Sequence, residues 1–490
     1  MTGGSTRHEA QDTVIPVDGL TFLIPARTFR IEGTLLKGGY VSLATEFALR
    51  LLRDAGELPP GEVGAFYGFS ERETGVLVQE LLLDGYIELS SDRIRLSKRG
   101  EDAFNPVTGE LQMLSIESFG DTVSLDLVAF APVDTMGGAR MPWLSEIEIP
   151  DKAKAAAATE AGRDGFRSNF GEWRERRFKG LAAATVRLQT VDEITPLGRP
   201  LTPLTVPVNY TPMISDLVEP DFGNLRDKGR RGSREKLVDA LSNLVRGITS
   251  PGDHLVAADT TAEWDRGILT QPASTVAGVL SWLQVTHRGA LDLPEWLAPS
   301  IRLAGSMTLP ASASRVFEFI DSAVQLDDDA PPVFWLPAEH AAWGRNASLS
   351  DVARELDKDS GGIVLLPRTD TDDSARKELV RQYGAGKDGR SQPLFTACVA
   401  LPPNTLPLSL ELIVQPTRWA LALIHVPAPK TGFPIPIGYA STNQTVVNGI
   451  CTRLADSIAR ADEESVFWAP ADSVPTTILG ELHRQLLSTK

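Results

Sequence analysis

A short basic hairpin that follows a helix is the feature that most constrains this chain. The stretch ELLLDGYIELSSDRIRLSKRGEDAF spans residues 80–104. An apolar run at helical spacing ends at Asp84-Gly85, where a glycine commonly ends a helix. Two short segments of alternating apolar and polar residues follow at 86–89 and 94–96, and such alternation predicts strands. Another helix is expected to begin directly after the second segment.

Three helices are predicted before this hairpin. Apolar positions recur at helical spacing over 41–53, and a proline pair at 59–60 begins a second short helix. Ser70 and Glu73 have the spacing of a capping box, in which a hydroxyl and a carboxylate satisfy free amides at a helix start. The third helix is expected to continue to about Leu83.

This order of elements resembles a winged helix-turn-helix domain over about residues 38–106. In that family the third helix usually enters the major groove of DNA, and the hairpin, called the wing, contacts phosphate or the minor groove. Glu71 and Glu73 would repel phosphate near the helix start, so the wing suits DNA better than the helix does. A winged helix that binds protein is the alternative. The resemblance implies DNA contacts by Arg72 on the third helix and by Arg93, Arg95, Lys98 and Arg99 on the wing.

The charge of the chain restricts how it could hold nucleic acid. With a formal net charge of −16, it can bind DNA only through local basic patches. The stretch LRDKGRRGSREK at 225–236 is such a patch and opens a predicted helix that ends near Gly247. A solvated loop that pairs with the acidic C-terminal part of the chain is the alternative. The residues expected to contact DNA here are Arg226, Lys228, Arg230, Arg231 and Arg234.

The remaining sequence predicts a multidomain protein of the α+β and α/β classes. Residues 20–36 alternate as strands, 110–133 fit a hairpin that turns at Gly120-Asp121, and 183–210 fit two further strands. From HLVAAD at 254–259, expected to be a strand, strands and helices alternate, which indicates an α/β layer with a substantially parallel sheet. The expected domains are an N-terminal tail with strands (1–37), the winged helix (38–106), a mixed α+β region (107–250) and an α/β sheet domain (251–490).

The C-terminal stretch RWALALIHV…IPIGYASTNQTVVNGICTRLADSIARA resembles the closing part of phospholipase D-like domains attached to helix-turn-helix regulators. Active members of that family need a His-x-Lys pair in each half, with the histidine as nucleophile. No such pair occurs here: His425 and Lys430 are five residues apart, and His254 has no lysine nearby. The resemblance therefore implies a domain without the family's hydrolytic activity.

Other motifs for chemistry are weak or missing. The six histidines form no local cluster, neither Cys398 nor Cys451 belongs to a metal-binding pattern, and no metal or cofactor is predicted. GAGKDG at 384–389 matches a dinucleotide fingerprint but follows a helix and precedes a strand, so a connector is expected. His340 beside Glu339 follows a predicted strand end, where acid–base residues can lie. A histidine that only caps or packs is the alternative, and no catalytic residue is assigned.

Three functions remain open from the sequence. The first is a regulatory or accessory protein that binds DNA, as a transcription regulator or a subunit of a bacterial antiviral defence or DNA-processing complex, with a C-terminal sensing or partner-binding domain. The second is a hydrolase or nuclease of degenerate phospholipase D-like type that uses His340, His254 or His425. The third is a structural subunit that binds a protein partner or another copy of itself. No 18-residue apolar run occurs and only two cysteines are present, so we expect a cytoplasmic protein without membrane contact.

Overall fold

A computed structural model of the chain describes residues 14–38, 42–106, 109–111, 114–135, 141–178, 186–212, 217–226, 234–323, 330–384, 393–470 and 474–488. The chain forms two compact units, each assembled from separate stretches. Unit 1 comprises residues 1–25, 134–150 and 200–490, and unit 2 comprises 26–133 and 151–199. The four consecutive domains expected from the sequence differ from this division, and their boundaries stay predictions.

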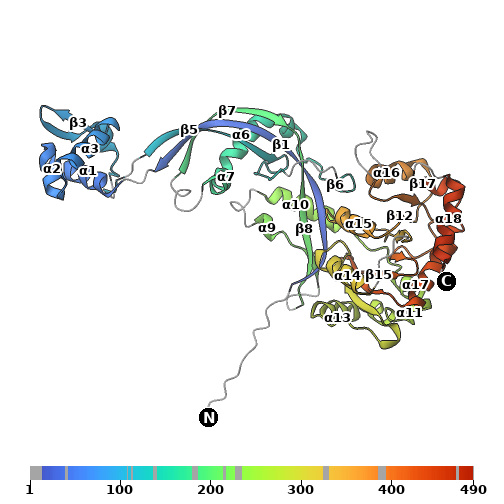
Figure 1. Cartoon of the computed structure of the whole chain (residues 1–490). Helices are drawn as coiled ribbons and strands as arrows, with labels where there is room; N and C mark the ends of the chain where they lie inside the picture. The colour runs from blue at the N-terminus through green and yellow to red at the C-terminus, as the bar shows by residue number, and fades with distance from the viewer. Residues whose placement is uncertain are drawn as a thin grey trace, which may run out of the picture. The chain divides into compact units, whose positions relative to one another are not determined.

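Unit 1 is built on a mixed sheet (Figure 1). The neighbouring strands β11, β12 and β13 are parallel, whereas the other neighbours are antiparallel. The expected substantially parallel sheet is therefore wrong, because short connections join β14, β15 and β16 as hairpins where crossover helices would be needed for parallel pairing. The strand order is β10 (Ser300–Ala304), β16 (Pro434–Ser441), β15 (Trp419–Pro427), β14 (Leu410–Gln415), β11 (Val333–Leu336), β12 (Ile363–Leu365), β13 (Ala397–Val399) and β17 (Val466–Trp468).

Helices cover both faces of this sheet. On one face, α14 (Pro310–Ala323) and α15 (Leu349–Lys358) share a buried core with strand residues such as Trp335 and Ile413. On the other face, α11 (His254–Asp265) and α17 (Gln444–Ile458) pack against each other and against β15. The remaining longer helices are α13 (Val276–His287), α16 (Asp373–Tyr383) and α18 (Pro475–Leu487).

Helix α11 corrects one expectation, because HLVAAD at 254–259 is its first part and not a strand. The side chains of Ala257, Thr261 and Trp264 are buried, at the spacing of one helix face. Six residues were too few to distinguish this period from the alternation of a strand.

Unit 1 also contains the first part of the long strand β1 (Ile15–Gly38). This part pairs with β8 (Leu201–Tyr210) and with β6 (Ser145–Glu146). A short strand β9 (Val218–Pro220) pairs with β8, and the helices α9 (Gly223–Arg226) and α10 (Glu235–Arg246) follow in the sequence.

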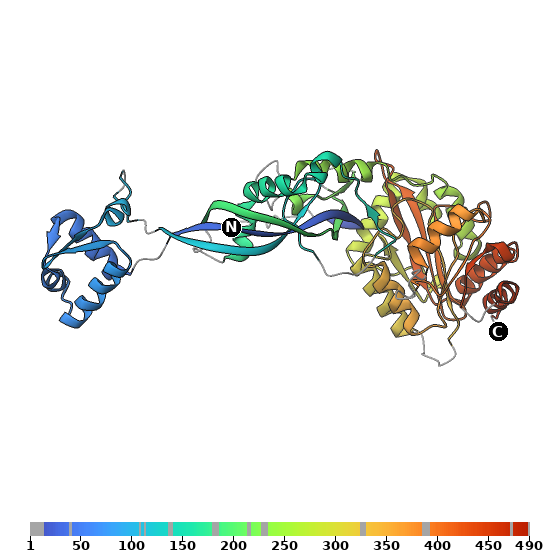
Figure 2. The same cartoon turned by 90° about the horizontal axis from the view of Figure 1, so that it is seen from above.

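Unit 2 uses the second part of β1, which pairs with β5 (Leu114–Asp126) and β7 (Val186–Gly198) (Figure 2). The expected hairpin turn at Gly120-Asp121 is wrong: β5 continues through these residues, which pair with Glu32 and Ile31 of β1. The long partner strand extends the pairing past the glycine. Aromatic side chains of α6 (Ala158–Ser168) and α7 (Phe170–Arg177), among them Phe166 and Trp173, form the core with this sheet. A short helix, α5 (Lys152–Ala156), precedes α6.

Between β1 and β5 lies a helical module, residues 42–106, with its own core of Leu49, Leu52, Leu77, Leu81, Ile94 and other side chains. Its helices and hairpin come in the order expected from the sequence: α1 (Leu43–Ala55), α2 (Pro60–Tyr67), α3 (Glu71–Leu83), β3 (Ile87–Ser90), β4 (Arg93–Leu96) and α4 (Lys98–Asp102). A short strand that was not expected, β2 (Glu57–Leu58), pairs with β4. The capping box of Ser70 and Glu73 is present in both directions. Gly38 of β1 pairs with Leu114 of β5, so the module connects two adjacent strands. Membership of the winged-helix family stays a prediction.

Candidate functional site

Several polar side chains of unit 1 gather at one edge of its sheet. Glu339 and His340 follow the end of β11, and Arg368 follows the end of its parallel neighbour β12, so these ends share an edge. β14 is antiparallel to β11 and begins at the same edge with Glu411 as its second residue. β15 ends there and carries His425. The carboxyl ends of strands are where open α/β sheets place ligand sites.

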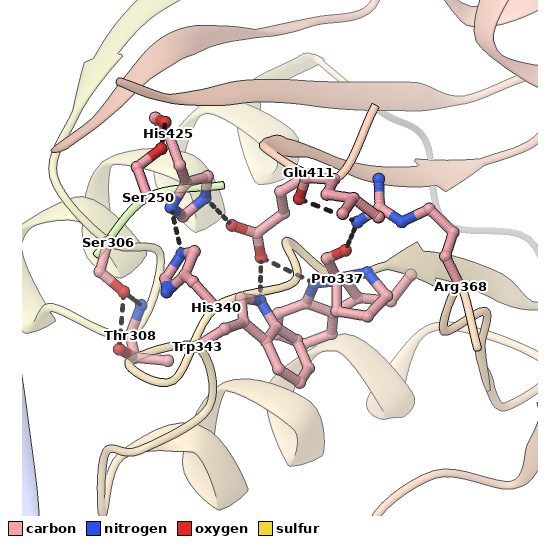
Figure 3. Close-up of polar contacts among 11 residues, drawn as sticks. Ser250, Ser306, Thr308, Pro337, His340, Trp343, Arg368, Glu411 and His425 are labelled. Carbon is pink, nitrogen blue, oxygen red and sulfur yellow. Dashed lines mark hydrogen bonds and ion pairs between the residues drawn. The ribbon is translucent and has the colours of Figure 1, made fainter. Parts of the chain in front are cut away.

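Glu411, His425 and His340 form a continuous hydrogen-bonded chain, here called the relay cluster (Figure 3). Nε2 of His425 lies 2.8 Å from Oε2 of Glu411. Nδ1 of the same ring lies 2.8 Å from Nε2 of His340. Glu411 and His425 are each 3% exposed, whereas His340 is partly exposed, so the cluster leads from a buried carboxylate toward the surface of the unit.

Two tryptophans hold the carboxylate of Glu411 in place. The indole N–H groups of Trp335 and Trp343 both donate to Oε1, at 2.9 and 2.8 Å. Burial alone would raise the pKa of Glu411, but the hydrogen bonds from His425, Trp343 and Trp335 and the charge of His425 outweigh burial and lower this pKa. Glu411 is therefore an ionised acceptor at neutral pH.

The carboxylate determines which ring nitrogens carry protons when both histidines are neutral. Because Glu411 can only accept, Nε2 of His425 is the donor, and Nδ1 of His425 is then an acceptor. Nε2 of His340 must donate to it, which leaves the lone pair on Nδ1 of His340. That atom is buried and has no hydrogen-bond partner within the described part of the chain. Burial, followed by the positive charges of His425 and Arg368, lowers the pKa of His340 well below its ordinary value.

Arg368 stabilises the loops around the relay cluster. Its side chain is buried, and its guanidinium donates to the carbonyl oxygens of Pro337, Pro407 and Leu408. Burial lowers the pKa of Arg368 to about 10, so it stays charged at neutral pH. Its backbone N–H donates to Oε1 of Glu339 at 3.1 Å. Through the hydrogen bonds of its Nη1 and Nη2 atoms to backbone carbonyls, Arg368 fixes the loops that follow β11 and precede β14.

Asp18 of β1 is a second buried carboxylate near the relay cluster. Its Oδ1 accepts a hydrogen bond from the N–H of Gly19 at 2.7 Å, and its side chain also interacts with Ser306. Burial raises the pKa of Asp18 to about 6, against the lowering effects of that backbone hydrogen bond and of His425. Asp18 is therefore within electrostatic range of the relay cluster.

The loop before β14 and the end of β15 are anchored by the residues ahead of α11. The carboxylate of Asp253 accepts hydrogen bonds from the N–H groups of Leu408 and Ser409, at 2.5 and 2.9 Å. The hydroxyl of Ser250 donates to the carbonyl of His425 at 2.8 Å. His254 adjoins this anchor but does not join the relay cluster, although its Nδ1 is likewise buried without a partner among the described residues.

The basic residues predicted on the wing lie on the helical module, and acidic neighbours accompany most of them. Arg93 and Arg95 form ion pairs with Glu57 at 3.8 Å and with Glu88 at 3.2 Å. Lys98 lies 3.0 Å from Asp102, and the guanidinium of Arg99 lies over the ring of Tyr86. Arg72 is exposed near the start of α3.

The second predicted patch belongs to unit 1. Arg226 is the last residue of α9, and Lys228, Arg230 and Arg231 lie outside the described residues. Arg234 is buried directly before α10, with 7% of its surface exposed. A buried side chain is poorly placed for a phosphate contact, so Arg234 gives this patch little support. The patch and the wing belong to different units.

The helical module exposes large apolar side chains. Leu43 and Phe47, one turn apart on α1, are 68% and 43% exposed, and Phe66 of α2 is 69% exposed. Tyr67 joins them, because its ring stacks on Phe47 with 5.6 Å between centroids and meets Phe66 edge-on at 5.0 Å. We call these four residues the aromatic patch. Helical spacing was the one feature of the sequence that pointed to these residues.

Metal chemistry finds no support in the described ranges: no group of three or more histidine, cysteine, aspartate and glutamate side chains there could hold a metal ion. Cys398 and Cys451 are free and buried, and burial raises the pKa of both thiols. None of the helices in these ranges is long and apolar enough to span a bilayer.

The chain matches no protein-family model, no curated protein and no solved structure. Its function must therefore be inferred from its own residues.

Glu411 is the residue of the relay cluster that the sequence analysis missed. A signal was present, because a glutamate within the apolar run LSLELIVQ is rarely buried without a partner. The histidine in the apolar run ALALIHV supplies that partner.

Proposed function

We propose that this protein is a regulatory or accessory subunit that binds a protein partner through the aromatic patch of its helical module. The observation that carries the proposal is this exposed patch on an acidic module. A contiguous patch of exposed apolar side chains marks a protein-interaction site, whereas single exposed apolar residues are normal.

The charge of the module supports a protein partner over DNA. Residues 42–106 contain twelve acidic and seven basic side chains, so the net charge is −5. The cationic groups of Arg93, Arg95 and Lys98 lie next to carboxylates, which reduces the positive potential that a phosphate backbone would meet. The solvent-facing residues of α3 include Glu71, Glu80 and Val76. Carboxylates and an aliphatic side chain suit a protein surface better than the polar edges of base pairs.

The composition of the patch suits an interface centre. Tyrosine and phenylalanine supply a large contact area at a low cost in side-chain entropy, and such residues dominate the energies of many protein interfaces. The hydroxyl of Tyr67 donates to the backbone carbonyl of Phe47 at 2.9 Å, which restrains the Tyr67 ring against α1 before any partner binds. Preorganisation of this kind strengthens binding because less freedom is lost on association.

A site-specific photo-crosslinking experiment in the native cells tests this proposal. A photoreactive amino acid replaces Phe66 in the full chain, and a matched control places it at Leu89, which is 55% exposed on β3 and lies outside the aromatic patch. We expect one protein to be crosslinked from position 66 and not from position 89. Phe66→Asp should reduce recovery of that protein at least about tenfold, as loss of a central interface residue does, and Leu89→Asp should not.

DNA binding through the wing stays the competing prediction, together with a role in transcription regulation or in a bacterial defence complex. Salt-dependent binding of a DNA duplex by the purified chain, with no partner crosslinked from position 66, would overturn the protein-partner proposal.

A further inference from the structure

The relay cluster at the edge of the sheet in unit 1 has one unused end. Oε1 of Glu411 accepts hydrogen bonds from two indoles, and Oε2 accepts one from His425. Both ring nitrogens of His425 form hydrogen bonds within the relay cluster. The remaining atom is Nδ1 of His340, which is buried and lacks a partner among the described residues. A buried acceptor without a partner costs free energy, so its retention calls for a ligand or a proton.

We infer that Nδ1 of His340 is the proton-accepting end of a three-residue relay that serves a small bound molecule with an acidic hydrogen, namely water or a hydroxyl-bearing ligand. This inference concerns unit 1 alone and does not depend on the partner proposed for the helical module. The site would be a proton acceptor at the strand edge where α/β sheets bind ligands.

The proton movements balance without any further reactant. The ligand's O–H bond breaks, its proton joins Nδ1 of His340, and the oxygen keeps the electron pair. The proton on Nε2 of His340 moves to Nδ1 of His425, which is 2.8 Å away. His425 then carries two protons and a positive charge, and its Nε2–H continues to donate to Glu411. His340 ends neutral with its proton on the other nitrogen.

The surroundings favour the charge on His425 over the charge on His340. His425 contacts the carboxylate of Glu411 directly and lies in the field of Asp18. His340 is close to the positive charge of Arg368, which opposes a second charge there. Glu339, the neighbour of His340, interacts with the same arginine. A proton accepted at His340 is therefore drawn inward to the residue that the carboxylate can stabilise.

Nitrogen NMR of the full chain, labelled at its six histidines, tests the relay directly. His340→Gln and His425→Gln assign the signals. We expect the neutral form of each ring to carry its proton on Nε2. When the relay cluster takes up one further proton, the charge should appear on His425 while the proton of His340 moves from Nε2 to Nδ1. A proton on Nδ1 of His340 in the neutral cluster, or a cationic His340 beside a neutral His425, would overturn the inference.

Hydrolysis of 4-nitrophenyl acetate tests whether the accepted proton comes from a reacting water. We expect His340→Gln to lower the rate of the full chain by about a hundredfold or more, the lower end of what a general base contributes. His254→Gln is the control, because that ring also has a buried Nδ1 without a described partner but is not part of the relay cluster. Equal rates in the wild type and His340→Gln would refute the activation of water by His340. If His254→Gln lowered the rate as much as His340→Gln does, the activity could not be assigned to the relay cluster.

Discussion

Glu411 and His425 are fourteen residues apart in the sequence, yet Nε2 of the imidazole lies 2.8 Å from Oε2 of the carboxylate in a site where each residue is 3% exposed. Adjacent antiparallel strands bring them together, since Glu411 pairs with Leu423, two residues before His425. The two side chains therefore lie on the same face of the sheet. This pair organises the polar edge of unit 1.

Replacing Glu411 by glutamine is expected to destabilise unit 1. The variant keeps the size of the side chain but removes the charge that accepts from His425, Trp335 and Trp343. Loss of a charged hydrogen-bond acceptor in a buried site costs about 2 kcal/mol. Urea denaturation followed by tryptophan fluorescence would measure this loss. Glu378→Gln is the control, since Glu378 forms an exposed ion pair with Arg381, and it should change stability by less than about 1 kcal/mol.

Asp18 is expected to make the protein less stable as the pH rises from 4 to 6. Because burial raises its pKa from 3.8 to about 6, the folded state keeps the proton in this window while the unfolded state has lost it. The free energy of unfolding therefore falls by on the order of 3 kcal/mol across the window, and it stays lower by that amount at higher pH.

The comparison of wild type and Asp18→Asn isolates this effect from other carboxylates. The asparagine can still accept the hydrogen bond from the N–H of Gly19. We expect the variant to gain stability relative to the wild type as the pH rises from 4 to 6.5, in urea denaturation at a series of pH values. A difference between the two proteins that stays constant over this range would contradict the role assigned to Asp18.

Charge reversal on the wing tests whether the helical module binds protein or DNA. If the module binds protein, Arg93→Glu with Arg95→Glu should leave duplex binding undetectable or unchanged in fluorescence anisotropy at low salt. If the wing contacts DNA, the same change should weaken binding by orders of magnitude and reduce the salt slope by about two, one for each lost phosphate contact. Lys430→Glu on unit 1, a residue not assigned to any site here, is the control for net charge.

Two glycines of the module give opposite expectations for the same substitution. A Cβ at Gly64 of α2 would collide with the Thr74 side chain of α3, so Gly64→Ala should destabilise the module by about 1–3 kcal/mol. A Cβ at Gly75 of α3 would meet nothing within 4 Å, so Gly75→Ala should stabilise it by about 0.5–1 kcal/mol. Hydrogen exchange of the α1 and α3 amides would measure both. Equal effects would show that α2 and α3 do not pack closely at this point.

Local signals predicted much of the secondary structure. The capping box at Ser70 and Glu73 has its expected hydrogen bonds, and the third helix, expected to continue to about Leu83, ends at that residue. Short-range patterns sufficed because caps, glycines and apolar periodicity act within a few residues of one another. They failed at HLVAAD, where only the packing of α11 distinguishes helix from strand.

The relay cluster could be predicted only in part. His340 and His425 were singled out one at a time, but their contact joins residues 85 apart and depends on the order of strands in the sheet. That order could not be derived from periodicity. The alternation of strands and helices predicted a substantially parallel sheet, whereas most neighbouring strands are antiparallel. The aromatic patch could not be predicted for a related reason, since helical spacing alone does not show which apolar side chains of a helix lack a neighbour.

The pairing of Gly38 with Leu114 places the strand ends that flank the helical module at neighbouring backbone positions. An insertion between two neighbouring positions adds little strain to its host, so such a segment can be lost, gained or exchanged during evolution without rebuilding the surrounding sheet. The same geometry gives a practical route to engineering: a short turn in place of the module should preserve the pairing of β1 with β5, and a different binding domain could be grafted at the same junction.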